Sequence, residues 1–89
     1  MITAKEAREI ARKTNESLAQ VAVKEVIPKI DEIIKKNAEI GNTKTIWYAN
    51  ADYSKFIYSI CEEVVKYGYS ASVDFDDERG HYLNICWKK

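Results

Sequence analysis

The residues best suited to binding a cation form one acidic run, Asp74-Phe75-Asp76-Asp77-Glu78. Hard cations prefer carboxylate oxygens, but the run lacks the further spaced oxygen ligands of a calcium loop. His81 is the only histidine, so one chain cannot build a proton-shuttling histidine pair or a multi-histidine metal site. We therefore predict no metal site and interpret the run as a solvated hairpin tip, with His81 at the start of the next strand.

Nucleophilic and phosphate-binding motifs are equally sparse. Cys61 and Cys86 are the only cysteines and lack the C-x-x-C spacing of a redox or zinc motif, so reduced thiols are expected. Cys61 falls within a helical apolar stripe, which indicates a packing residue rather than a reactive thiol. The three glycines form no Gly-rich phosphate loop and no nucleophile elbow. We predict a non-enzymatic protein without cofactor or catalytic residues, and a nucleotide hydrolase is the weakest alternative.

One remaining group of side chains could bind a ligand. Trp47 and Tyr82 are expected on the outer face of a sheet, among Ser72, Asp74 and Asn84. Aromatic rings beside short polar groups can stack on a planar, nucleotide-like ligand while the polar groups orient it. The same composition is typical of protein interfaces, where Trp and Tyr are enriched. A third interpretation is a half-buried sheet face under part of the first helix or a neighbouring subunit.

Length and charge limit the remaining function classes. A chain of 89 residues suffices for a single domain, with a helical arm over 1–40 and a strand-helix-strand-strand unit over 44–89. The 14 basic and 14 acidic residues cancel, which disfavours nucleic acid and anionic membranes as partners. No signal-peptide pattern and no membrane-spanning apolar run is visible, so a soluble protein of the cytosol is expected.

The N-terminal part of the chain predicts one long helix. Thr3-x-x-Glu6 is a capping box at its start, and Gly41 can adopt the left-handed conformation that ends it. Pro28 removes a backbone hydrogen bond and clashes with the preceding turn, so a kink or a break is expected at Val26-Ile27. Between these ends, apolar and small residues recur at spacings of three and four: Ala7, Ile10, Ala11, Thr14, Leu18, Val21, Ala22, Ile27, Ile30, Ile33 and Ile34.

The rest of the chain predicts an α+β fold. Residues 45–48 are typical of a strand, and Asn50 or Asp52 caps a second helix that Gly68 ends. Two alternating segments, 70–75 and 81–87, then form a hairpin. The crossover makes the first two strands parallel, so the last strand is expected between them and antiparallel to both.

Alternation with period two assigns each strand residue to one face of this three-stranded sheet. We expect these side chains to face the helices: Ile46, Tyr48, Ala71, Val73, Phe75, Leu83, Ile85 and Trp87. We expect these on the outer face: Thr45, Trp47, Ser70, Ser72, Asp74, Tyr82, Asn84 and Cys86.

The first helix also predicts an oligomer. From Ala4 to about Ile40 it is roughly 55 Å long, whereas a compact domain of this size is about 30 Å across. Part of its apolar stripe therefore extends beyond the sheet and needs another cover. A second copy in a two-fold antiparallel pair is the simplest cover, so at least a dimer is expected. Its interface would consist of Ala7, Ile10, Ala11, Leu18, Val21 and Ala22.

Three segments resemble those of small uncharacterised phage-encoded and prophage-encoded α+β proteins of similar length: Ile2-Thr3-Ala4-Lys5-Glu6-Ala7-Arg8, Gly68-Tyr69 and Ile85-Cys86-Trp87. The shared motifs are structural and assign no binding residue. The resemblance implies an accessory protein that acts stoichiometrically in the host cytosol. Counter-defence is the expected role, by sequestering a nucleotide-like immune signal or by blocking a host defence protein. A structural or assembly protein of the phage particle is the alternative.

Overall fold

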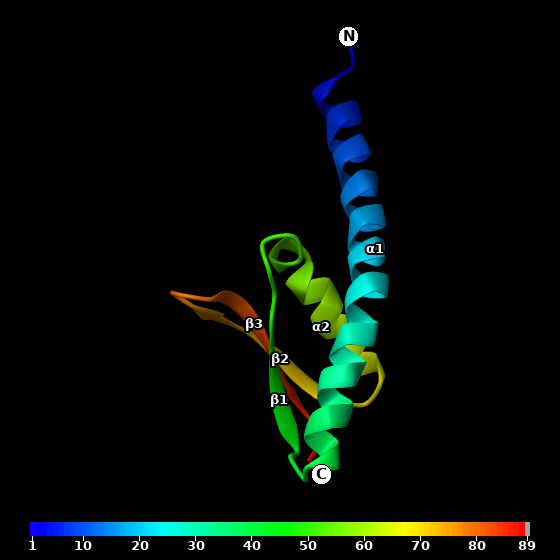
Figure 1. The fold of residues 1–89 in the computed structure, drawn as a ribbon. Coiled ribbons are helices and arrows are strands. Elements are labelled where there is room, and N and C mark those ends of the chain that lie inside the picture. Colours follow the sequence, from blue (N-terminus) through cyan, green and yellow to red (C-terminus); the bar gives the residue numbers. More distant parts are fainter. Residues whose placement is uncertain (89) are drawn as a thin grey trace.

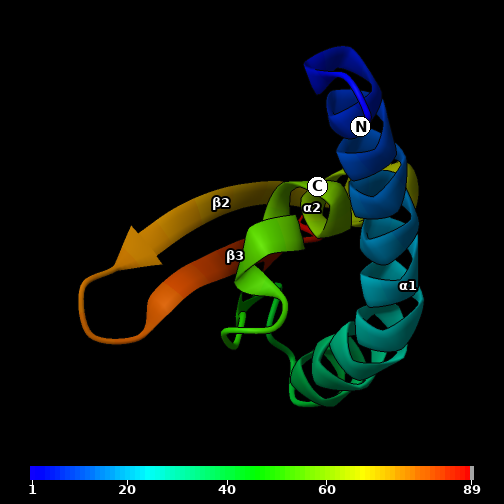
Figure 2. The ribbon, with the colours of Figure 1, turned by 90° about the horizontal axis from the view of Figure 1, so that it is seen from above.

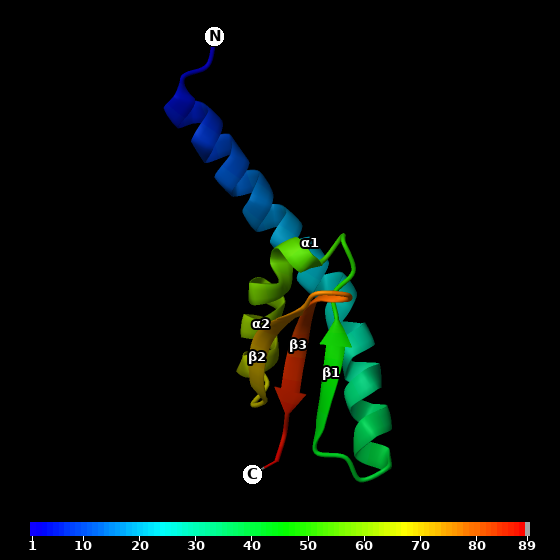
Figure 3. The same cartoon turned by 90° about the vertical axis from the view of Figure 1, so that its left-hand side faces the viewer.

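The structure is a computed structural model that describes residues 1–88. Both helices lie on one side of a three-stranded sheet (Figures 1 and 3), so the expected α+β fold is confirmed. The elements follow one another as α1 (Ala4–Glu39), β1 (Lys44–Tyr48), the 3-10 turn η1 (Ser54–Phe56), α2 (Ile57–Lys66), β2 (Ser70–Asp76) and β3 (Gly80–Cys86).

Helix α1 begins and ends where its capping residues predict. The Thr3 hydroxyl oxygen accepts a hydrogen bond from the Glu6 amide at 3.1 Å, which satisfies one free N–H of the first turn. At the other end Gly41 has a φ of +87°. The amides of Gly41 and Asn42 donate to carbonyl oxygens of the last turn at 3.0 and 2.9 Å. This is the pattern by which a left-handed glycine ends a helix.

Pro28 does not break α1, which stays helical from Ala4 to Glu39. Of the two expected outcomes, a kink or a break, the break does not occur, and Figure 3 shows the helix axis changing direction along its length. Pro28 and Lys24 are both exposed, so water can reach the Lys24 carbonyl that lacks an amide donor. Solvent exposure explains how the helix continues past the proline.

The sheet has the order β1-β3-β2 with both pairs antiparallel, as the crossover argument predicts. The tip between β2 and β3 is closed by Asp76, whose carboxylate accepts from the amides of Glu78 and Arg79 at 2.8 and 3.2 Å. Gly80 follows with a φ of +84°. The second half of the acidic run therefore lies at a hairpin tip, as predicted, whereas Asp74 and Phe75 belong to β2.

Strand β1 presents the opposite face from the one expected. Trp47 is only 8% exposed, and Thr45 accepts a hydrogen bond from the Asn37 side chain of α1 at 3.1 Å. Both side chains therefore lie on the helix side, while Ile46 and Tyr48 lie on the outer face and are 46% and 37% exposed. The strand carries bulky side chains on both faces, so alternation alone could not choose between them.

The hydrophobic core lies between the two helices and the inner face of the sheet. Its buried members are Val26, Ile30 and Ile34 of α1, Ile57, Ile60 and Val64 of α2, and Trp47, Ala49, Leu83 and Ile85 of the sheet region. Full burial of one such aliphatic side chain stabilises the fold by about 1.5 to 3 kcal/mol. Phe75 was expected in this core but is 56% exposed, because the hairpin extends past the helices (Figure 2).

The molecule is elongated, with extents of 59 × 29 × 20 Å. The N-terminal half of α1 projects beyond the sheet and α2 (Figure 1), so the expected overhang is confirmed. From here on, the arm means only residues 4–21, the part of α1 that projects, and the body means residues 22–88. Ala22 was expected at an intermolecular interface but is only 4% exposed within the single chain, so that assignment is wrong. The other expected interface residues, Ala7, Ile10, Ala11, Leu18 and Val21, are exposed.

Candidate functional site: the outer face of the sheet

The face of the sheet opposite the helices is uncovered within residues 1–88 (Figure 3). We call this surface the outer face. The antiparallel pairing aligns its side chains in rows across the three strands. It is formed by Lys44, Ile46 and Tyr48 of β1, Tyr82, Asn84 and Cys86 of β3, and Ser70, Ser72 and Asp74 of β2.

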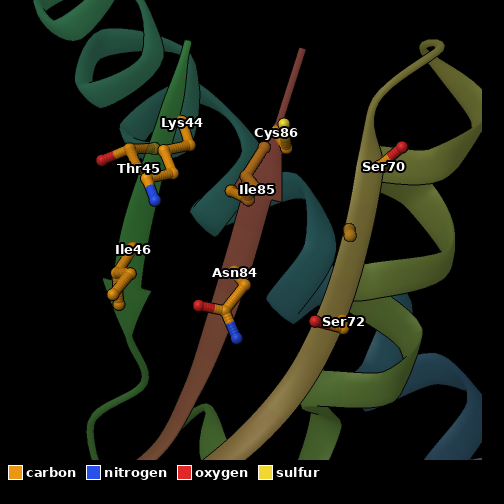
Figure 4. Close-up of a pocket in the computed structure, with 9 residues that line it drawn as sticks. Lys44, Thr45, Ile46, Ser70, Ser72, Asn84, Ile85 and Cys86 are labelled. Atoms are coloured by element: carbon orange, nitrogen blue, oxygen red, sulfur yellow. The ribbon is translucent and has the colours of Figure 1, made fainter. Parts of the chain in front are cut away.

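The Lys44 end of the outer face is hollowed into a shallow trough of about 440 Å³ (Figure 4). Asn84 projects from the central strand, with Ile46 on one side and Ser72 on the other. The trough is hollow because serine side chains are short beside the neighbouring strand. The Asn84 amide offers two donors and one acceptor, and the serine hydroxyls can donate or accept. The trough can therefore hold a flat polar group such as a peptide unit or a side-chain amide.

The hairpin end of the outer face is aromatic. Tyr48 and Tyr82 are paired across β1 and β3, with ring centroids 5.3 Å apart and ring planes 47° apart. The Arg79 guanidinium lies 5.2 Å from the centroid of the Tyr48 ring, within range of a cation–π interaction. These contacts hold the rings in place before any ligand binds. Such a fixed aromatic cluster loses little side-chain entropy on binding.

The aromatic end carries negative charge. The pKa of Tyr82 is raised, first by desolvation and then by the nearby carboxylate of Asp74, with a smaller contribution from Asp76. A raised tyrosine pKa means that the surroundings disfavour an anion at that point. Arg79 adds one positive charge to an end that carries the acidic run Asp74-Phe75-Asp76-Asp77-Glu78. The aromatic end is therefore unfavourable for an anionic ligand, whereas Lys44 marks the opposite, basic end.

The structure brings together four of the five residues that the sequence selected. Ser72 is paired with Asn84, and Asp74 with Tyr82, on neighbouring rungs of the β2–β3 ladder. Trp47 does not belong to the group, since its ring is buried with its centroid 6.4 Å from that of Tyr53. The prediction of Trp47 as a site residue was wrong because the sequence analysis assigned the wrong face of β1 to the outside.

Sequence reasoning missed Ile46, Tyr48 and Arg79. Ile46 and Tyr48 alternate with Trp47, so placing Trp47 in the core would have placed both of them outside. The hydrogen bond from the Asn37 side chain to the Thr45 hydroxyl would have shown which face of β1 is buried. It could not be predicted, because no sequence pattern indicates that these two residues touch. Arg79 lies in a turn, where period-two reasoning does not apply.

The remaining reactive groups of the described chain offer little chemistry. Burial, and then the negative charge of Glu62, raises the pKa of the Cys61 thiol, which keeps it protonated and a poor nucleophile. The His81 ring meets the Phe75 ring edge-on, with centroids 5.0 Å apart and ring planes 63° apart. Within residues 1–88, no three acidic, histidine or cysteine side chains converge as a metal site would require.

Comparison of the chain with protein-family models, curated proteins and solved structures finds no match. Neither helix within residues 1–88 combines the length and the apolarity needed to cross a membrane. The outer face must therefore be interpreted from its own residues.

Proposed function

We propose that this chain is a non-enzymatic binding protein that binds a partner protein through its outer face and thereby blocks it. The observation that carries the proposal is an uncovered sheet face with a preformed Tyr48–Tyr82 pair at one end and a polar trough around Asn84 at the other. Tyrosine provides much of the binding energy in protein interfaces, and hydrogen-bonding groups beside it provide specificity.

The shape of the outer face supports a protein partner over an enclosed small molecule. Small-molecule sites typically bury most of the ligand surface in a concave pocket. Here the trough is shallow and opens along a sheet (Figure 4), and the largest ring expected to stack on a ligand, Trp47, lies in the core. Tyr48 and Tyr82 already contact each other, and Arg79 covers part of Tyr48.

The charges also argue against a nucleotide at the aromatic end. A phosphate group bound beside Tyr82 would lie near Asp74 and Asp76, which already disfavour a negative charge there. A basic or neutral partner surface has no such penalty. We therefore propose that a lysine or arginine of the partner lies opposite Asp74, with a polar group of the partner in the trough.

The resemblance to phage-encoded accessory proteins supplies the proposed setting. In that setting the partner is a host defence protein of the cytosol, and binding blocks it stoichiometrically. This is counter-defence by occupancy, which needs no catalytic residue. Sequestering a nucleotide-like immune signal is the competing mechanism, and the negative charge of Asp74 and Asp76 beside Tyr82 makes it the less favourable one.

The experiment is affinity capture with matched variants. Tagged wild-type chain, Asn84→Arg and Tyr58→Arg are incubated with lysate of the cell in which the chain is naturally made. Asn84→Arg fills the trough, whereas Tyr58 is 68% exposed on α2, away from the outer face. We expect one protein to be retained stoichiometrically by wild type and Tyr58→Arg and to be lost with Asn84→Arg. Circular dichroism of each variant checks that the fold is intact.

Two results would contradict the proposal. One is a partner retained equally by wild type and Asn84→Arg, which would place the interface elsewhere. The other is a nucleotide released by heating wild-type protein in a one-to-one ratio, detected by mass spectrometry, which would favour sequestration.

A further inference from the structure

The arm carries an apolar stripe that the body leaves uncovered. Ile10, Leu18 and Val21 are 57%, 45% and 52% exposed. Ala7 and Thr14, also exposed, complete the stripe. Exposed large apolar side chains aligned on one helix face are typical of an interaction site.

The stripe points away from the body. At about 100° per residue, its centre lies roughly 140° around the helix from the line of α1 residues buried against α2 and the sheet. That buried line consists of Ala22, Val26, Ile30 and Ile34. On the body side the arm instead presents polar residues such as Arg8, Arg12 and Glu16. The body therefore leaves the stripe uncovered within residues 1–88, and a movement of the body toward its own side of the arm would not cover it.

The spacing of the stripe is self-complementary. Counted from Thr14, apolar residues lie four and seven positions away in both directions: Ile10 and Leu18, then Ala7 and Val21. A two-fold axis through Thr14 therefore places Ile10 against Leu18 of the partner copy, and small Ala7 against larger Val21. An interface between identical copies requires a patch that matches itself in this way. We propose that two copies pair their arms antiparallel, with the two-fold axis at Thr14.

Charges at the edges of the stripe fit the same arrangement. The axis brings Glu6 of one arm within about one helical turn of Lys24 of the other, along the same edge. Lys13 approaches its own copy near the axis, which is the one unfavourable pair. In a parallel pairing Glu6 and Lys24 would each approach their own copy instead of each other.

The size of the interface sets the expected affinity. The contact runs about 21 Å from Ala7 to Val21 and contains few large apolar side chains in each copy. It is small beside a standard interface of about 800 Å² per partner. We therefore expect a reversible dimer with a dissociation constant on the order of 10 µM. The dimer would place the two bodies, and hence the two outer faces, at opposite ends.

The first test is sedimentation equilibrium of the full chain from 1 to 200 µM. We expect a reversible shift toward twice the protomer mass of 10.3 kDa. Ile10→Glu with Leu18→Glu should weaken the dimer at least 100-fold. Lys5→Gln with Arg12→Gln changes the net charge equally on the other side of the arm and should leave association within about three-fold of wild type. All four positions are exposed, so thermal unfolding of the monomer should change little.

The second test distinguishes the orientation by disulfide formation in a Cys61→Ala, Cys86→Ser background. Thr14→Cys should cross-link readily, because the axis brings position 14 against itself. Ile10→Cys alone should not, because its copy lies about 12 Å away along the pair. Ile10→Cys mixed with Leu18→Cys should give the mixed disulfide. Efficient self-cross-linking of Ile10→Cys would overturn the antiparallel pairing. A monomer at 200 µM, or an assembly unaffected by the glutamate pair, would overturn the interface itself.

Discussion

Replacing Trp47 by alanine tests the corrected face of β1, on which the outer face depends. Trp47 is 8% exposed and packs in the core with Leu83 and the Tyr53 ring. Removing a buried tryptophan side chain costs about 3 to 5 kcal/mol, from lost burial and the cavity left behind. A chain of this length has a total stability of roughly 4 to 13 kcal/mol. Trp47→Ala should therefore lose a large fraction of that stability.

Tyr48→Ala is the matched control, because Tyr48 is the next residue of the strand and faces the other way. It is 37% exposed and its main packing partner is the Tyr82 ring. The loss should be about 1 kcal/mol, the usual size of an aromatic pair contribution. Urea unfolding followed by circular dichroism measures both values, and Trp47→Phe provides a milder variant if Trp47→Ala does not fold. A loss below about 1 kcal/mol for Trp47→Ala, or a larger loss for Tyr48→Ala, would refute the assignment of the faces.

Three further predictions concern local features. Gly41→Ala should destabilise the chain by about 1 to 2 kcal/mol in urea unfolding, because the φ of +87° is strained for alanine although its Cβ would meet no atom within 4 Å; an unchanged midpoint would contradict the helix ending. Pro28→Ala should stabilise it by about 1 to 3 kcal/mol by restoring a helix hydrogen bond, and a loss of stability would show that the proline is required for packing. The pKa of Tyr82 is raised by desolvation and by Asp74, so its contribution to stability is present below the unfolded pKa near 10 and is lost as pH rises through the folded pKa. In an ultraviolet titration, Asp74→Asn should lower the pKa of Tyr82 but not return it to the ordinary tyrosine value, because desolvation remains. An unchanged tyrosine titration would remove the argument for negative charge at this end.

The sequence was sufficient where a local rule decides the structure. Thr3 and Gly41 mark the two ends of α1 because capping and left-handed backbone are properties of single residues. The sheet order followed from the crossover, which leaves the first two strands parallel, and the hairpin followed from its polar tip. Most of the candidate site followed too, because Ser72, Asp74, Tyr82 and Asn84 lie on strands with clear alternation.

The sequence was insufficient where packing decides between equal local choices. Trp47 and Tyr48 are both aromatic, and only the contacts of Trp47 in the core and the Asn37–Thr45 bond fix which of them is buried. Phe75 has the correct parity for the core, yet the helices end before they reach it. Pro28 is tolerated because its turn faces water, which no residue pattern records.

The central claim is that the outer face binds a partner protein, and site-specific photo-cross-linking tests it most directly. A benzophenone amino acid is placed at position 84 in the trough, or at position 58 on α2 as the control, and the protein is irradiated in the cell that naturally makes it. The proposal predicts a single protein adduct of defined mass from position 84 and none from position 58. No adduct at position 84, or the same adduct from both positions, would contradict it.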